Sequence, residues 1–245
     1  MRHIVSTLAL LAATALAGCA GAPHGATSVN AGSLVEASAS APHIVEGDLD
    51  ISNESSLAEY ENLEIVTGTL TIVGNTRLGN LDGLGHLRAV GHLVIKENLA
   101  LTSIDALSGL RHARSVTIEG NPRLENLHGL ASLKKLHRLV VTDNGIFCTS
   151  GVSGLTEVGE LVVSRNPRLL SLRGFSHLES AGSVTIVDNP RLAARSGFLV
   201  DLRRVTGRLE IQRNAGLEPG EVRALEQRIN AEATAQSDDV HPGPG

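Results

Sequence analysis

The segment TIEGNPRLENLHGL, residues 117–130, gathers polar side chains of the kinds that carry out acid–base and metal chemistry. Glu119, Glu125 and His128 fall within ten positions, together with two asparagines and an arginine. Carboxylates beside an imidazole can act as general acid and base, or can hold a metal ion. The same segment could also be one copy of a structural repeat, so the surrounding sequence must decide between the two interpretations.

The chain repeats this segment along most of its length. Eight stretches begin with a short alternating pattern and end at an asparagine, as in GTLTIVGN (68–75) and GSVTIVDN (182–189). The asparagines are Asn53, Asn75, Asn98, Asn121, Asn144, Asn166, Asn189 and Asn214. Their successive spacings are 22, 23, 23, 23, 22, 23 and 25 residues, a regularity that is typical of solenoid proteins.

Each repeat predicts one strand followed by leucine-lined bends. Leu70 and Ile72 flank Thr71, so the two apolar side chains face one side of a strand and the threonine faces the other. After the asparagine, leucines recur every third residue, as at Leu78, Leu81, Leu84 and Leu87. Such a unit cannot bury its apolar side alone and must stack on its neighbours. We therefore expect a right-handed leucine-rich β-solenoid over residues 45–217, with about eight coils and one parallel sheet.

The repeated asparagine is predicted to be structural. It stands where the strand bends, and its amide can bond both the turn backbone and the asparagine of the next coil. A buried backbone group left unpaired costs roughly 1–3 kcal/mol, so a ladder of stacked amides is the favoured interpretation. Pro122, Pro167 and Pro190 follow three of these asparagines and restrict the bend further.

One row of the sheet is the candidate binding face. The outward residues of the central strands are uncharged, and they are Thr71, Val94, Thr117, Val140, Val162 and Thr185, with Asp50 and Glu210 at the two ends. This flat row could bind a protein or a glycan. The alternative is that β-branched residues simply suit exposed strands and pack across the coils.

Three other polar sets are weaker candidates. One is an arginine row after the asparagine turns, formed by Arg77, Arg123, Arg168 and Arg191. It could bind an anionic glycan or a lipid phosphate. It could instead be a solvated edge whose charge is balanced by Glu97, Glu119, Asp143 and Asp188. Asp82, Asp105 and His128 share a repeat position and have acid–base character, but no nucleophile or pocket accompanies them in the sequence. The ten histidines do not converge, so we expect neither a metal site nor a cofactor.

The fifth repeat departs from the pattern. It reads NGIFCTSGVSGL and is one residue shorter, with Phe147 predicted at the leucine position and Cys148 directly after it. Such an irregularity indicates either a functional loop or a tolerated packing defect. The only other cysteine is Cys19, which is predicted to carry a lipid, so Cys148 has no intramolecular partner. We therefore expect no disulfide and interpret Cys148 as an apolar core residue.

The first residues predict export and lipidation. A basic start and the apolar run IVSTLALLAATALA (4–17) are typical of a signal peptide and too short to span a bilayer. The following Gly18-Cys19 completes a segment that resembles the lipobox of bacterial lipoproteins. The resemblance implies cleavage of residues 1–18 and a lipid on Cys19, and Ala20 after it implies the outer membrane.

The segments outside the repeats have their own predicted roles. Residues 19–44 are rich in Ala, Gly and Ser and are predicted to be a flexible tether. Residues 218–232 place Val222, Leu225 and Ile229 at helical spacing and are predicted to form a helix that caps the last coil. Residues 233–245 are predicted to be a disordered tail.

Composition excludes one class of partner. Aromatic residues make up 2% of the chain and the net charge is −5. Single-stranded nucleic acids bind on stacked aromatic rings and basic grooves, and duplexes require a basic surface. We therefore expect no nucleic-acid partner.

The repeat GxLxIxxNPxLxxLxGLxxL resembles the receptor L domain, the leucine-rich β-helix of insulin-receptor and epidermal-growth-factor-receptor ectodomains. Related patterns occur in bacterial surface lipoproteins. The resemblance implies a non-catalytic protein that binds other macromolecules through its sheet, although the receptors' Trp and cysteine-rich modules are missing here. We therefore expect a lipid-anchored binding or scaffold protein of the bacterial envelope, not an enzyme. The alternatives are a polysaccharide-active enzyme on a β-helix and a purely structural spacer.

Overall fold

The computed structural model describes residues 43–54, 56–193 and 199–238, of which 232–238 are described by their backbone only. The predicted signal peptide, the lipidation site Cys19 and nearly all of the predicted tether lie outside the described residues. So do residues 239–245 at the end of the chain. Within the described part the protein is mostly β, with a single α-helix at its C-terminal end.

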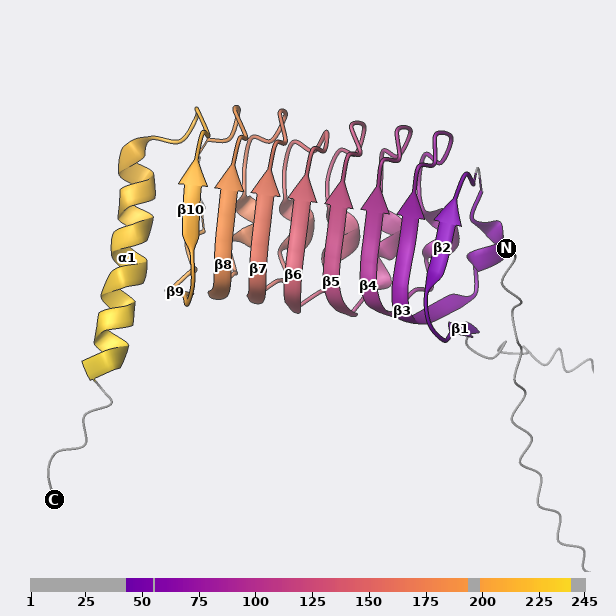
Figure 1. Ribbon diagram of the computed structural model, residues 1–245, viewed down its shortest axis with the longest axis horizontal. Helices are drawn as coiled ribbons and strands as arrows, with labels where there is room; N and C mark the ends of the chain where they lie inside the picture. The colour runs from indigo at the N-terminus through magenta and orange to yellow at the C-terminus, as the bar shows by residue number, and fades with distance from the viewer. Residues whose placement is uncertain (1–42, 55, 194–198, 239–245) are drawn as a thin grey trace, which may run out of the picture. The chain divides into compact units, whose positions relative to one another are not determined.

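Ten strands form one sheet in which every pairing is parallel. They are β1 (His43–Val45), β2 (Leu49–Ser52), β3 (Leu63–Val73), β4 (Ala89–Lys96), β5 (His112–Glu119), β6 (Lys135–Thr142), β7 (Glu157–Ser164), β8 (Ser180–Val187), β9 (Arg204–Val205) and β10 (Leu209–Gln212). Strands β3 to β8 lie side by side in chain order; β1 and β2 both pair with β3, and β9 and β10 both pair with β8 (Figure 1). The predicted single parallel sheet is therefore confirmed, and the architecture is that of a β-solenoid.

Short 3₁₀ turns return the chain from the end of one strand to the start of the next. They are η1 (Ala58–Tyr60), η2 (Asp82–Leu84), η3 (Asp105–Gly109), η4 (His128–Leu130), η5 (Ser150–Val152) and η6 (Arg173–Phe175). In Figure 1 these turns lie behind the sheet. Each repeat thus supplies one wall of sheet and one wall of turns, and the core lies between the two walls.

The core consists of the rows that the alternating pattern predicts. Leu70 and Ile72 are fully buried, as are Leu93 and Ile95 on the next strand. The leucines spaced by three come from the turn wall and are also buried, among them Leu78, Leu81, Leu84 and Leu87. Because each strand's inward side chains meet those of the neighbouring coils, one continuous apolar cluster runs through the sheet.

The helix α1 (Pro219–Asp238) packs at the end of the sheet next to β9. Pro219 suits the first position of a helix, and Glu221 accepts a hydrogen bond from the Glu218 N–H at 2.9 Å. Leu225 and Ile229 are buried in the same cluster as the solenoid core. The single C-terminal helix is therefore confirmed.

Two predicted boundaries are wrong. The helix continues to Asp238, past the predicted end at residue 232, because residues 231–236, AEATAQ, are rich in good helix formers. At the other end, β1 starts at His43 inside the predicted tether of residues 19–44. Its Ile44 and Val45 are β-branched and pair with Ile65 and Val66 of β3.

Candidate functional site

The predicted binding face is a continuous row across the sheet. Successive members are direct register partners, in the order Thr71, Val94, Thr117, Val140, Val162 and Thr185. All six side chains are half-buried, because each packs against the member on the next strand. Asp50 and Glu210 pair with the two ends of the row. We call these six residues the outer row.

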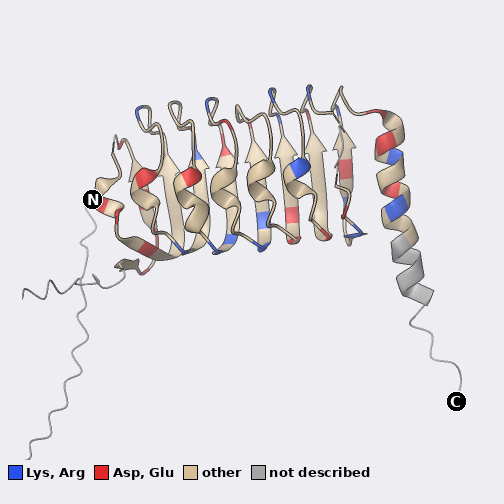
Figure 2. Cartoon of the chain, turned by 180° about the vertical axis from the view of Figure 1, so that it is seen from behind, with Lys and Arg blue, Asp and Glu red and all other residues tan. Residues whose placement is uncertain are grey.

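The charges that flank the outer row are paired from strand to strand. Side chains two positions away project from the same face of a strand. On one flank Lys96 bonds Glu119 at 2.8 Å, and on the other Arg138 approaches Glu160 at 3.3 Å. The face therefore presents an uncharged β-branched centre between neutralised flanks. Figure 2 agrees, since the strands are mostly free of charged residues and the charges gather on turns and edges.

The asparagines bond one another as a buried ladder. The Asn121 backbone N–H and its Nδ2 both donate to Asn144 Oδ1, at 3.1 and 3.0 Å. Nδ2 also donates to the carbonyl oxygens of Ile95 and Glu119, each at 3.1 Å. The amide thus closes both its own turn and the gap to the neighbouring coil. The buried ladder residues are Asn75, Asn98, Asn121, Asn144, Asn166, Asn189 and Asn214.

The prediction that Asn53 belongs to this ladder is wrong. The pairing of Ser52 with Val73 places Asn53 opposite Gly74 and Glu54 opposite Asn75. The Glu54 backbone N–H donates to Asn75 Oδ1 at 2.7 Å, so Glu54 occupies the ladder position in the first coil. Asn53 is exposed at a φ of 60°, in the left-handed region that asparagine tolerates.

The residue before each ladder asparagine adopts this left-handed conformation, and several of these residues form ion pairs. Arg165 binds Asp143 through two nitrogens at 2.9 and 2.7 Å, and Arg213 binds Asp188 in the same way. The hydrogen bond and charge of Arg213 lower the pKa of Asp188 below its usual value. These contacts run along the turn edge from one coil to the next.

The arginine row is therefore not balanced by the acids proposed for it. Glu119 pairs with Lys96, while Asp143 and Asp188 pair with Arg165 and Arg213. The four row members are exposed, and none forms an ion pair within 4.0 Å among the described residues; they are Arg77, Arg123, Arg168 and Arg191. The row is a set of separate solvated cations along the turns.

The acid–base column gains a residue that the sequence reasoning missed. His128 Nε2 lies 2.9 Å from Ser150 Oγ, and Asp105 Oδ1 lies 4.0 Å from His128 Nδ1. Asp105, His128 and Ser150 start consecutive 3₁₀ turns, and their shared repeat position was the available signal. Cys148 Sγ adds a contact to Ser150 Oγ at 3.2 Å. The order acid–imidazole–hydroxyl is that of a serine nucleophile with its base.

The setting of this column does not favour catalysis. The side chains of His128 and Asp105 are 54% and 58% exposed. A serine nucleophile needs donors that stabilise an oxyanion in a site that excludes water. Stacking places residues of one repeat position next to one another on adjacent coils, so the coil repeat alone accounts for the arrangement. Asp82, at the same position, has no hydrogen bond or ion pair to Asp105.

The irregular fifth repeat is filled differently from the prediction. Ile146 occupies the leucine position and is fully buried, whereas Phe147 is 37% exposed beside Leu170, which is 44% exposed. The missing residue falls before Ile146, which moves Phe147 outward. Cys148 is half-buried and free, so its assignment as a core residue is also wrong. It stands where Asn126 and Ser171 cap the turns of neighbouring coils.

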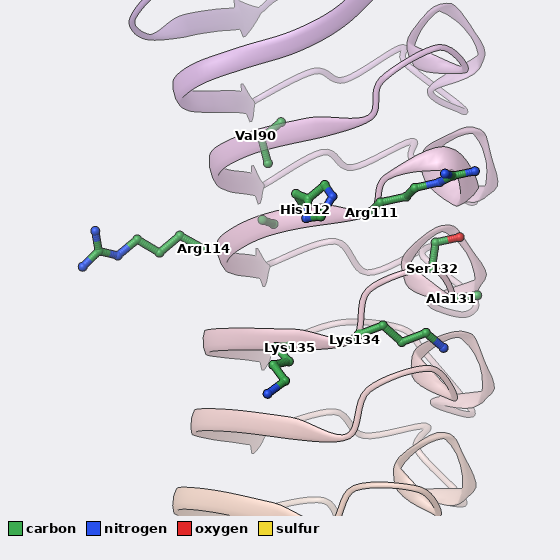
Figure 3. A pocket seen from close by; sticks show the side chains of 9 residues that line it. Val90, Arg111, His112, Arg114, Ala131, Ser132, Lys134 and Lys135 are labelled. Carbon is green, nitrogen blue, oxygen red and sulfur yellow. The ribbon is translucent and has the colours of Figure 1, made fainter.

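One basic pocket was missed entirely at the sequence level. It lies at the start of β5 and β6 and is lined by Val90, Arg111, His112, Ala113, Arg114, Ala131, Ser132, Lys134 and Lys135 (Figure 3). The available signals were the clusters RHAR (111–114) and KK (134–135), which stand 23 residues apart and so fall on adjacent coils.

Fold and surface together place the protein in the class of β-solenoids with a single parallel sheet. Neither a protein-family model nor a curated protein matches the chain. None of the helices among the described residues combines the length and the hydropathy that a membrane span requires. No group of three or more His, Cys, Asp or Glu side chains among the described residues is arranged to hold a metal ion.

Proposed function

We propose that this protein is a lipid-anchored component of the bacterial envelope that binds a protein or a glycan through the outer row, without catalysis. The single observation that carries the proposal is the outer row itself. Six uncharged side chains in direct register form a flat surface between paired charges. Depletion of charge at the centre is characteristic of interface cores.

The rigidity of the sheet supports a binding role. The asparagine ladder and the parallel pairing fix each strand against its neighbours, so the outer row is already ordered before a partner arrives. A preordered surface loses little conformational entropy on binding. The receptor L domain, which the repeat resembles, also uses a rigid leucine-rich sheet. The proposal also includes the handedness and size of the solenoid, which we take to be right-handed with about eight coils.

The anchor completes the proposed function. Residues 1–18 would direct export, and a lipid on Cys19 would hold the mature chain at the outer membrane. A single chain tethered in this way presents the outer row to whatever lies within reach of residues 20–42. The membrane is thus one partner, through the lipid, and the ligand of the outer row is the second. No nucleic acid, metal or cofactor has a part in this proposal.

A charge placed in the outer row tests the proposal. The double variant Val140→Lys and Val162→Lys puts two cations at the centre of the row, and we expect loss of the partner in an affinity pull-down from detergent-solubilised envelopes. The matched control, Ser108→Lys and Ser153→Lys, adds the same charge on exposed turn residues and should retain the partner. Melting curves of both variants separate misfolding from lost binding.

The outcomes are distinct. Capture that survives in the Val140/Val162 variant removes the outer row as the binding surface. Capture lost equally in both variants shows that charge, and not position, is responsible, and also contradicts the proposal. If the captured material is digested by glycosidases, the partner is a glycan; if it is digested by proteases alone, the partner is a protein.

A further inference from the structure

In the centre of the sheet, the parallel ladder lacks its first pairs between β5 and β6. Strands elsewhere in the centre of the sheet pair from their first residue, as in Ala89 with His112, Lys135 with Glu157 and Glu157 with Ser180. Between β5 and β6 the pairing begins only at Ser115 with Arg138. Three residues at the start of β5 therefore have no partner on β6.

The backbone hydrogen bonds before the strands show the same gap. The Arg111 N–H donates to the Arg88 carbonyl at 2.9 Å, and the Thr156 N–H donates to the Lys134 carbonyl at 2.9 Å. Among the described residues, no such bond joins the Lys134 or Lys135 N–H to Arg111. Two backbone donors and one acceptor, which the other coils use for stacking, are thus free at this point.

The sequence gives a steric reason for the gap. One repeat position, three residues before the outward residue at the centre of each strand, is glycine in most coils. These glycines are Gly68, Gly91, Gly159, Gly182 and Gly207, whereas the position is Arg114 on β5 and His137 on β6. A Cβ added at Gly91 would lie 2.5 Å from the carbonyl oxygen of Gly68. A Cβ at Gly159 or Gly182 would overlap the preceding coil in the same way. A side chain at this position is tolerated against a glycine, since β5 with Arg114 pairs with β4 from its first residue. β5 and β6 are the two adjacent strands that both lack glycine.

The basic pocket occupies this opening. Its volume is about 780 Å³, and its lining contains two arginines, two lysines and His112 but no acidic residue. In Figure 3 the side chains of Arg111 and Lys134 extend to the same side, on either side of Ser132, whereas Arg114 extends the opposite way. Lys135 is partly neutralised by Glu157 at 2.6 Å. Arg111 and Lys134 thus share one side of the pocket, and neither forms an ion pair among the described residues.

We propose that the opening between β5 and β6 is an anion-binding site for the phosphate group of a phosphate ester. A planar guanidinium binds two phosphate oxygens at once, an ammonium adds a point charge, and free backbone N–H groups complete the cradle. The whole chain carries a net charge of −5, so the positive charge is a property of this place and not of the surface in general. The site goes beyond the proposed function, since none of the outer row lines it.

Calorimetry on the full chain, purified in a non-ionic detergent at low ionic strength, tests the site. The probes are glycerol 3-phosphate, a monoester, and glycerophosphoglycerol, the deacylated headgroup of a phospholipid. We expect one-to-one binding of at least one probe. The variant Arg111→Gln and Lys134→Gln should bind at least tenfold more weakly, while Arg123→Gln and Arg168→Gln, with the same change in charge, should bind within twofold of wild type.

The two probes identify the source of the phosphate. Binding of the diester indicates a lipid headgroup, and binding of the monoester alone indicates a soluble phosphate ester. The proposal is overturned if the wild-type chain binds neither probe, or if the two double variants lose affinity equally.

The variant His137→Gly tests the opening separately from its charge. The variant keeps every lining cation, but β6 should be able to close onto β5. Closure would be measured as new protection of the Lys134 and Lys135 amides from hydrogen exchange. Probe binding should then fall at least fivefold. Unchanged binding with newly protected amides would show that the opening is not the site, and amides that stay unprotected would show that the steric explanation is wrong.

Discussion

The side-chain amide of a ladder asparagine supplies hydrogen-bond partners to several backbone groups that would otherwise be unsatisfied. Asn121 donates through its own N–H and through Nδ2, and its Oδ1 accepts from both the N–H and the Nδ2 of Asn98. It is completely buried, so water cannot take over these bonds after a substitution. Each ladder residue therefore stabilises two coils at once, and its contribution does not come from contact with a ligand.

Asn121→Ala should lower the free energy of unfolding by roughly 1–3 kcal/mol, because it leaves buried donors and acceptors of two coils unpaired. Chemical denaturation followed by circular dichroism measures the loss. Asn53→Gly is the matched control, since Asn53 is exposed in a left-handed conformation that glycine adopts freely. A midpoint for Asn121→Ala equal to that of wild type would contradict the ladder's energetic role.

The Asp105–His128–Ser150 chain is the arrangement that most resembles an active site. We expect it to be inert, because its histidine and aspartate are more than half exposed and a surface hydroxyl lacks oxyanion donors. Ser150→Ala should leave the hydrolysis of p-nitrophenyl acetate at the wild-type rate. A rate that falls at least tenfold in both Ser150→Ala and His128→Ala would instead identify a serine hydrolase, and would refute the non-catalytic proposal.

At the scale of elements, the sequence predicted the strands and the buried leucines well because both follow strict periods. Inward residues such as Leu93 and Ile95 alternate with Val94, and this pattern leaves one arrangement that buries them. Errors arose where one residue was inserted or lost. Aligning the first coil on Asn53 ignored the strand register, and the deletion before Ile146 shifted Phe147 outward.

Contacts between coils were harder to predict than the coils themselves. The opening between β5 and β6 depends on two residues, Arg114 and His137, that are far apart in sequence and meet only through stacking. The bond between His128 and Ser150 arises in the same way. In both cases the repeat alignment contained the signal, but its meaning depends on how closely neighbouring backbones approach.

The glycine position of the strands offers a test of that close approach. Gly159→Ala should destabilise the fold by about 1–3 kcal/mol, because the added Cβ would overlap the carbonyl of His137 and force β7 away from β6. Gly79→Ala is the control, since no atom lies within 4 Å of its Cβ position, and it should be neutral or slightly stabilising. Thermal denaturation of the two variants should therefore differ in sign; equal melting temperatures would contradict the packing argument.

At the scale of the whole molecule, the proposed function combines an anchor with a rigid face, and the two parts can be separated. Residues 1–42 would carry the proposed anchor, and the sheet from β1 to β10 carries the outer row. The anchor could be inferred only from its resemblance to a lipobox. The face could be inferred from the repeat, although its ligand cannot be read from β-branched side chains.

Cys19→Ala should remove the lipid while leaving the sheet intact. After osmotic lysis and ultracentrifugation, we expect the variant in the soluble fraction and the wild-type chain in the membrane pellet. Radiolabelled palmitate should label only the wild type. A variant that still sediments with membranes, with no difference in labelling, would contradict the lipoprotein proposal without affecting the outer row.

The uniform ladder has a consequence for how such a chain can change in length. From Asn75 to Asn189 each ladder asparagine donates its backbone N–H to the Oδ1 of the next, so Asn98 can bond Asn144 in the way that it bonds Asn121. Removing residues 99–121 as one block deletes a single repeat of 23 residues and keeps every remaining strand in phase. Adding or removing whole repeats therefore changes the length of the sheet in steps of one strand spacing, about 4.8 Å.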